Sequence, residues 1–255
     1  MALFDIFKKK SCDICGGEIG LLGNRKLEDG NMCKTCAKKL SPWFDDRRNS
    51  TIEQINEQLA YREANKAKVS AFNTTRVFGE DKKIYLDEDA RLFMVTSADS
   101  AREKEEENPD VLSFSDVVGV ITDIDEDKRE QMREDKDGNE VSYVPKRYTY
   151  YYDFNVTIQV NNPYFDDMRF QLNNSTVEIE QTGIRKIDPN TVPEYVHYKD
   201  MAAEIKEALL QVRQDVREEA KAAAAPKQAV TCPNCMATTI PDANGCCEFC
   251  GGAVK

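Results

Sequence analysis

The sequence predicts a mixed α+β protein, in which an antiparallel β sandwich or partly open barrel with a C-terminal helix stands between two small cysteine-rich modules. Three observations predict this arrangement. Pairs of cysteines occur near both ends of the chain, short apolar runs with a period of two fill the middle, and a pattern with a helical period follows them. A chain of 255 residues has room for one to three domains, and the cysteine pairs favour three.

Changes in composition along the chain divide it into five segments. We expect a cysteine module, a helical connector, a β region with an acidic hairpin and a terminal helix, a linker, and a second cysteine module. In the same order, these segments are residues 1–48, 49–71, 72–221, 222–231 and 232–255.

Eight of the nine cysteines form four pairs with a gap of two residues, which lets one tight turn point both thiolates at one metal ion. The pattern predicts two structural zinc ions, because a shell of four thiolates leaves no open position for catalysis. The ninth cysteine is Cys246, next to Cys247. Cys247 is assigned as the ligand because Cys247-x-x-Cys250-Gly251 repeats the pattern Cys12-x-x-Cys15-Gly16. Whether Cys246 can replace Cys247 stays open. The expected ligands are Cys12, Cys15, Cys33 and Cys36 in one site and Cys232, Cys235, Cys247 and Cys250 in the other.

Turn residues divide the first module into a knuckle, a hairpin and a helix. Gly16-Gly17 and Asp29-Gly30-Asn31 bracket a predicted hairpin over residues 19–27, and a helix is expected to start around Cys36 and run toward Leu40. Trp43 and Phe44 are expected to cover this small core. Ser50 and Glu53 then form a predicted capping box for a helix that ends near Ser70 and carries only a thin apolar stripe.

The middle of the chain is predicted to be antiparallel. Its longest strand covers residues 148–160, where Tyr150 and every second residue to Val160 share one face. Residues 80–140 hold 21 acidic and 9 basic residues, which accounts for the net charge of −11, and the stretch 123–140 is predicted to be a solvated hairpin tip.

A long amphipathic helix follows, and the second module after it has the composition of a minimal zinc ribbon. We expect the helix to cover an open end of the sheet, with a coiled-coil dimer as the alternative. Its apolar positions are Met201, Ile205, Ala208, Leu209, Val212 and Val216.

Three stretches resemble known families. Residues 12–20 and 29–40 resemble a bacterial zinc-finger family of unknown function with a treble-clef-like fold, which implies zinc binding by Cys12, Cys15, Cys33 and Cys36 and implies no activity. Residues 111–121, with the strands and long helix after them, resemble bacterial pleckstrin-homology-like domains. The C-terminal module is similar to zinc ribbons that end many bacterial proteins.

The sequence predicts a non-enzymatic, cytoplasmic zinc-binding adaptor with a protein partner. It contains no Gly-rich phosphate loop, and its single histidine, His197, precedes an amphipathic helix. It also lacks a secretory signal pattern and a run of eighteen apolar residues. No small-molecule substrate is indicated. The expected partner surface consists of Lys34, Lys38, Lys39, Trp43 and Phe44.

Two other functions stay open from the sequence. Residues 1–48 carry 10 basic and 7 acidic residues, so nucleic-acid binding by the zinc modules is an alternative that the acidic middle disfavours. Peripheral membrane binding is the other, because Leu3, Phe4, Ile6 and Phe7 precede a run of three lysines, Lys8 to Lys10.

Overall fold

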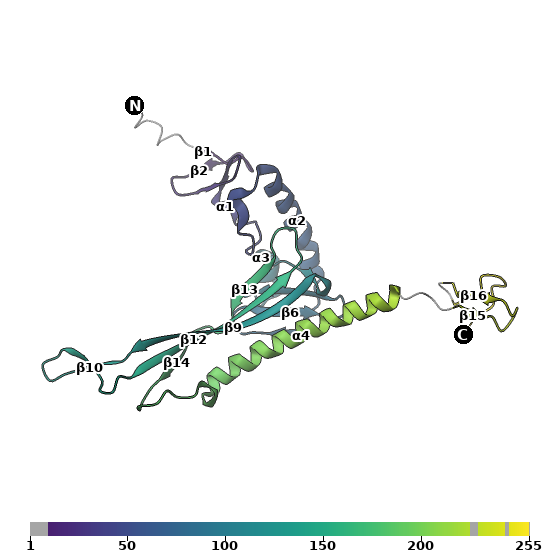
Figure 1. Cartoon of the computed structure of the whole chain (residues 1–255). Helices are drawn as coiled ribbons and strands as arrows, with labels where there is room; N and C mark the ends of the chain where they lie inside the picture. The colour runs from purple at the N-terminus through teal and green to yellow at the C-terminus, as the bar shows by residue number, and fades with distance from the viewer. Residues whose placement is uncertain (1–9, 225–228, 243–244, 255) are drawn as a thin grey trace. The chain divides into compact units, whose positions relative to one another are not determined.

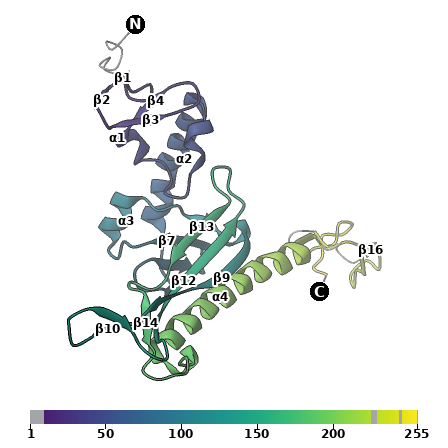
Figure 2. The ribbon, with the colours of Figure 1, turned by 60° about the vertical axis from the view of Figure 1, so that its left-hand side comes forward.

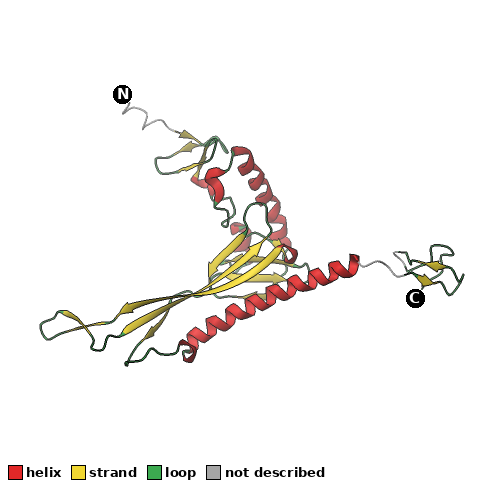
Figure 3. Cartoon of the chain, in the orientation of Figure 1, coloured by secondary structure: helices red, strands yellow, loops and turns green. Residues whose placement is uncertain are grey.

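The computed structural model describes residues 10–224, 229–242 and 245–254. The chain is α+β and falls into two compact units, Met1–Arg213 and Gln214–Lys255. The apolar N-terminal segment proposed for membrane contact and part of the predicted linker lie outside the described residues. Figure 3 shows that strands concentrate in the middle of the chain, with helices before and after them. Within the described residues, no helix combines the length and the apolar character needed to cross a membrane.

Two hairpins and one helical turn build the first module (Figure 1). The predicted helix is only one turn long, because hydrogen bonds to the third residue back replace the α-helical pattern after Ala37: Lys39 N–H donates to the Cys36 carbonyl and Leu40 N–H to the Ala37 carbonyl. The elements are β1 (Lys10–Ser11), β2 (Glu18–Ile19), β3 (Asn24–Lys26), β4 (Asn31–Cys33), α1 (Lys34–Ala37) and the 3-10 turn η2 (Asp46–Asn49).

Helix α2 (Ile52–Ala71) begins one residue later than the predicted capping box. Thr51, not Ser50, is the N-cap, and its hydroxyl and the Gln54 side chain serve each other's backbone N–H groups. The Ser50 hydroxyl is occupied elsewhere, since it donates to the Asp46 carbonyl. The helix joins two cores: Ile55 packs in the first module, and Val69 packs with residues of the β region.

The first four-stranded sheet has the order β5-β6-β7-β8, and all its pairs are antiparallel. Its two central strands are almost entirely buried, which explains their continuous apolar sequence. The elements are β5 (Arg76–Phe78), β6 (Lys83–Asp87), β7 (Leu92–Thr96) and β8 (Leu112–Ser113), with α3 (Ala101–Glu107) between the last two and η3 (Phe114–Asp116) after them.

The second sheet is organised around one long strand. β12 pairs along one edge with β9 and along the other with both β13 and β14 (Figure 2). The predicted alternation of β12 is confirmed, because every second side chain from Tyr152 to Val160 is buried. The strands are β9 (Val117–Glu130), β12 (Tyr148–Val160), β13 (Asp167–Gln171) and β14 (Val177–Glu180). Both sheets keep free edges, so no closed barrel forms among the described residues.

The acidic stretch forms a hairpin, as predicted. Beyond β9, the short strands β10 (Met132–Glu134) and β11 (Glu140–Ser142) pair around a turn at Asp135–Asn139. The Asp135 carboxylate closes this turn by accepting hydrogen bonds from the Asp137 and Asn139 N–H groups.

Helix α4 (Pro193–Ala224) follows η4 (Pro189–Thr191) and packs against the second sheet, as Figure 1 shows. It lies on β12, which is paired along both edges, rather than over an open end of the sheet as predicted. Tyr195 lies edge-on to Tyr152 and Phe154 of β12, with ring centroids 5.0 and 5.1 Å apart. Ile205 and Leu209, one turn apart, are fully buried on the same helix face.

The second unit has little regular structure apart from the end of α4. β15 (Val230–Thr231) pairs with β16 (Thr238–Thr239), and an isolated bridge joins Cys246 to Ala253. Its small core consists of Cys232, Cys247 and Val254, with Val230 packed against them. A core of this size is far below what an autonomous fold of ordinary residues needs, so another source of stability is required.

Candidate metal centres

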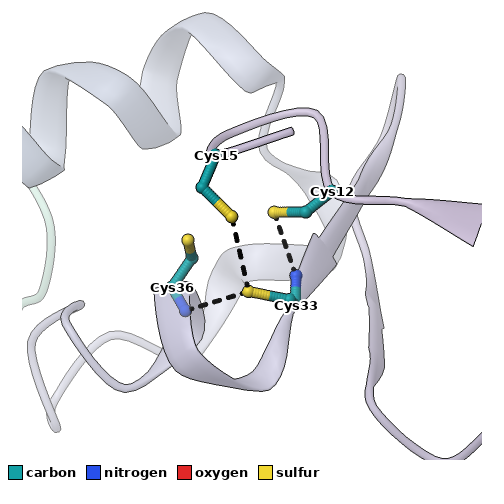
Figure 4. Close-up of side chains that lie close together, drawn as sticks. All are labelled: Cys12, Cys15, Cys33 and Cys36. Carbon is teal, nitrogen blue, oxygen red and sulfur yellow. Dashed lines mark hydrogen bonds between the residues drawn. The ribbon is translucent and has the colours of Figure 1, made fainter. Parts of the chain in front are cut away.

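The four predicted cysteines of the first module converge on one point, as Figure 4 shows. Cys12 and Cys15 come from the loop between β1 and β2, Cys33 ends β4 and is the N-cap of α1, and Cys36 lies in α1. Backbone N–H groups point at two of the sulfurs: Cys33 N–H donates to Cys12 Sγ at 3.2 Å, and Cys36 N–H donates to Cys33 Sγ at 3.3 Å. These donors would stabilise thiolates.

The second unit brings Cys232, Cys235, Cys247 and Cys250 together in the same way. Cys246 is not one of the four converging residues. Its backbone N–H donates to the Asp242 carboxylate, and the residue forms the bridge to Ala253. In both units the four sulfur atoms lie within 4.8 Å of one another.

The sulfur positions fit a tetrahedral metal ion. With a zinc–sulfur bond of about 2.3 Å, a tetrahedron places its sulfurs about 3.8 Å apart. The observed separations are 3.9 Å for Cys15–Cys33, 3.6 Å for Cys232–Cys250 and 3.7 Å for Cys235–Cys247. Each group could therefore hold one metal ion.

The same six-residue loop occurs three times, at residues 12–17, 232–237 and 247–252; we call each a knuckle. Two backbone hydrogen bonds of 2.8–2.9 Å close each knuckle. The N–H of the first cysteine donates to the carbonyl of the sixth residue, and the N–H of the fifth residue donates to the carbonyl of the first cysteine. The residue after the second cysteine has positive φ: Gly16 at 71°, Met236 at 62° and Gly251 at 67°. Three of the four Cys-x-x-Cys pairs thus share one backbone loop that aims two sulfurs at one centre, whereas Cys33 and Cys36 lie at the start of α1.

Without a cation, the sulfurs of each group favour different protonation states. Burial opposes ionisation of Cys12, but the N–H groups of Cys33, Cys15 and Ile14 outweigh it and lower its pKa to about 6. Burial, followed by the neighbouring sulfurs, raises the pKa of Cys36. A divalent cation removes this conflict, because it stabilises all four thiolates together.

Residues 10–58 match a domain of unknown function, DUF4428. The match includes the whole first cysteine group, and it ends inside α2, just after Ile55. It covers the stretch that resembles a zinc-finger family. The search of curated proteins and the search of solved structures each returned no match.

The side chains predicted to face a partner have different surroundings in the DUF4428 domain. Lys34, Lys38 and Lys39 are exposed. Phe44 is half-buried against the core of the domain, whereas Trp43 lies against Phe170 of β13, with ring centroids 6.5 Å apart. Both rings thus pack within the chain, and their use by a partner stays a prediction.

Two of the exposed lysines line a cleft that sequence reasoning did not identify. The cleft has a volume of about 360 Å³ and lies between the end of α1, the middle of α2 and the end of α3. Its charges are mixed, because glutamates from α2 and α3 face the lysines. The lining residues are Lys38, Lys39, Leu59, Arg62, Glu63, Lys66, Glu106, Glu107 and Asn108.

A buried ion pair joins helix α2 to the β region, and Ser41 of the first module contacts the same carboxylate. Arg62 Nη1 lies 2.7 Å from Asp110 Oδ1, and the Ser41 hydroxyl donates to Asp110 Oδ2 at 2.7 Å. The pKa of Asp110 is raised, because the effect of burial exceeds the lowering by Arg62 and Ser41. The feature of the sequence that indicates burial of Arg62 is a heptad stripe on α2. The stripe runs from Ile55 to Val69 through three polar residues, Gln58, Arg62 and Asn65.

His197 lies on the first turns of α4 and contacts the turn after β5. Its Nε2 is 2.9 Å from Glu80 Oε1, and the Tyr198 hydroxyl donates to Glu80 Oε2 at 2.8 Å. These contacts position the start of the helix.

Proposed function

We propose that this chain is a non-catalytic, zinc-binding adaptor that presents surfaces to a protein partner in the cytoplasm. The observation that carries the proposal is the pair of four-sulfur groups, whose geometry fits a closed tetrahedral shell. A shell of four thiolates holds no water or substrate, which supports a structural rather than a catalytic ion. A reducing cytoplasm would keep these cysteines available as ligands.

Zinc is proposed as the ion because tetrahedral four-sulfur sites favour zinc or iron. Metal analysis of the purified chain should give two zinc ions per chain. Cys12→Ser with Cys15→Ser should reduce that to one, and so should Cys232→Ser with Cys235→Ser. Iron in stoichiometric amount, or an unchanged metal content in either double variant, would contradict the assignment.

The cleft beside Lys38 and Lys39 supports a protein partner over a nucleic acid. Phosphate binding needs clustered cations, but Glu63, Glu106 and Glu107 line the same cleft and would repel a phosphate backbone. A protein can match a surface of mixed charge with side chains of both signs.

The partner surface is tested by charge reversal. Lys39→Glu should weaken retention of the partner that the wild-type chain captures, since the lysine is exposed and its replacement leaves the core intact. Lys136→Glu, a reversal on the exposed acidic hairpin, is the matched control and should have no effect. If both variants and the metal-stripped chain retain the partner as well as the wild-type chain does, these residues do not form the partner surface. Salt-sensitive retention on DNA or RNA would favour the nucleic-acid alternative.

For residues 72–221 we propose the pleckstrin-homology-like architecture. Two antiparallel four-stranded sheets followed by a long helix on β12 support it. An experimental structure of the chain that lacked this strand order would reject it.

A further inference from the structure

Two leucines stand almost fully exposed at the tip of a turn in the DUF4428 domain. Leu21 is 91 % exposed and Leu22 is 88 % exposed. They occupy the centre of the turn Gly20–Gly23 between β2 and β3, which the Gly23 N–H closes by donating to the Gly20 carbonyl at 2.9 Å. Figures 1 and 2 show this turn on the side of the domain away from α2. Neither leucine contributes to the core of the domain.

Cationic side chains follow directly behind this tip. Arg25 Nη1 donates to the Leu22 carbonyl at 3.4 Å, and Arg47 Nη1 donates to the Lys26 carbonyl at 2.6 Å. This hydrogen bond places Arg47 against β3, the strand that carries Arg25 and Lys26. Burial lowers the pKa of Arg47, and the charges of Arg25 and Arg48 lower it further. In the described part of the chain, none of Arg25, Lys26, Arg47 and Arg48 forms an ion pair.

Three carboxylates of this module, Asp13, Asp29 and Asp46, accept hydrogen bonds within it. Asp13 accepts the Asn31 N–H at 2.6 Å, and Asp29 accepts the Ile52 N–H at the start of α2 at 2.8 Å. Asp46 accepts the Asn49 side-chain amide at 2.6 Å. These carboxylates serve as local hydrogen-bond acceptors, which leaves the four cations available to an outside anion.

The strand register adds positive charge at the same end. β1 and β2 are antiparallel, and Lys10 lies opposite Ile19. Lys10 therefore lies at the end of this hairpin where the Gly20–Gly23 turn begins. Lys10 is exposed, and Lys8 and Lys9 precede it in the sequence, outside the described residues.

We propose that the turn Gly20–Gly23 docks on an anionic lipid bilayer, with Leu21 and Leu22 inserted among the acyl chains and the cations behind them against lipid phosphates. A bilayer suits this surface better than a protein partner does. A stable protein interface buries roughly 800 Å² on each side, whereas a narrow tip of two apolar side chains backed by cations matches the boundary between hydrocarbon and anionic headgroups. The inference is independent of the proposed adaptor role.

The test is co-sedimentation of the full metal-loaded chain with vesicles of phosphatidylcholine, with and without phosphatidylglycerol. We expect binding to require phosphatidylglycerol and to weaken as salt is raised. Burial of each leucine side chain in the bilayer should raise the partition coefficient about tenfold or more. Leu21→Ser with Leu22→Ser should therefore lower the partition coefficient by about a hundredfold. Lys26→Gln with Arg48→Gln should lower it only on vesicles with phosphatidylglycerol.

Val144→Ser with Ile184→Ser is the matched control, because these apolar side chains are 94 % and 78 % exposed elsewhere in the chain and should not affect binding. As a second measurement, Leu22→Trp should gain fluorescence that lipids with brominated acyl chains quench, above the constant signal of Trp43. Equal binding with and without phosphatidylglycerol overturns the proposal. So does a Leu21→Ser, Leu22→Ser variant that binds like the wild type while removal of residues 2–9 abolishes binding.

Discussion

Met236 occupies the knuckle position that glycine fills in the other two knuckles. Its φ of 62° is costly for a residue with a Cβ atom, and its side chain is 75 % exposed, so little packing compensates. Met236→Gly should therefore stabilise the metal-loaded second unit by about 1 kcal/mol. Thermal unfolding of the second unit would measure the gain. Met236→Ala retains the Cβ atom and should give no gain; an equal gain in both variants would contradict the backbone explanation.

Asp110 shows a second effect at the residue scale, because it is fully buried with a single cationic partner. Arg62→Met should destabilise the first unit by about 3–5 kcal/mol, since it leaves a buried carboxylate without its counter-charge. Urea unfolding monitored through Trp43 would give the free energy of unfolding.

A double variant separates this electrostatic cost from lost packing. Arg62→Met with Asp110→Asn should recover most of the stability, because the asparagine oxygen can still accept the Ser41 hydroxyl and no charge remains buried. If the double variant is as unstable as Arg62→Met alone, packing rather than charge explains the loss.

At the residue scale, spacing carried most of the predictive power. Two residues between cysteines constrain the loop so strongly that all eight sulfurs fall into two groups. Asp110 could not be identified, because it is one of 21 acidic residues in residues 80–140 and burial depends on contacts distant in the sequence.

At the scale of elements, the start of α4 is held by a carboxylate from the turn after β5. The hydrogen bond from His197, followed by that from Tyr198, lowers the pKa of Glu80. A carboxyl group with a lowered pKa in the folded state stabilises the protein above its unfolded pKa, and this stability is lost as the pH falls through the folded value.

Glu80→Gln should therefore lower the thermal midpoint at neutral pH, and the difference from the wild type should shrink as the pH is taken below the ordinary range of glutamate. Paired melting curves across that range would measure it. Glu88→Gln, which removes an exposed ion pair with Arg76, is the control and should change the midpoint little. A difference for Glu80→Gln that is independent of pH would contradict the electrostatic origin.

Elements with a long, regular pattern were predictable, and for β12 both ends were predicted as well, whereas the ends of the first two helices were not. The alternation of β12 and the apolar stripe of α4 identified both correctly. The capping box of α2 was misplaced by one residue, because Ser50-Thr51 offers two hydroxyls and the choice depends on the Asp46 carbonyl, which takes the first. The end of helix α1 was placed too late, because the residues after Ala37 form tighter turns that the sequence pattern does not distinguish from a helix.

At the scale of the whole molecule, metal removal should affect the two units differently. The core of the DUF4428 domain includes Ile55 of α2, and the Ser41 hydroxyl after α1 reaches Asp110 of the β region. Loss of the first ion should therefore weaken the β region as well, whereas loss of the second should unfold residues 229–254 alone.

Hydrogen exchange by region, with and without a strong chelator, would measure this difference. In Cys232→Ser with Cys235→Ser, which lacks the second site, amides of β6 and β7 should keep their protection until chelator is added. Unchanged protection of these strands after removal of both ions would contradict the coupling.

The sequence predicted a mixed α+β molecule with two cysteine modules, but not how the first module joins the β region. That junction depends on polar side chains. The heptad stripe of α2 indicates which face of the helix is buried, but it does not identify the residues that pair, which lie 48 and 69 residues apart in the sequence. Periodicity and residue spacing in the sequence indicate local structure, whereas pairs of side chains that are distant in the sequence meet only in the folded chain.

The position of α2 also bears on how the chain can be divided. Ile55 and Val69 anchor the helix in two cores, and the family match ends at residue 58, between them. A fragment cut at that boundary would retain only seven residues of α2, too few for a helix that persists without tertiary support. A cut at the end of α2 would still separate Ser41 and Arg62 from Asp110, and Val69 from its core. The borders of the matched sequence are therefore not the borders of a physical unit, which includes the β region.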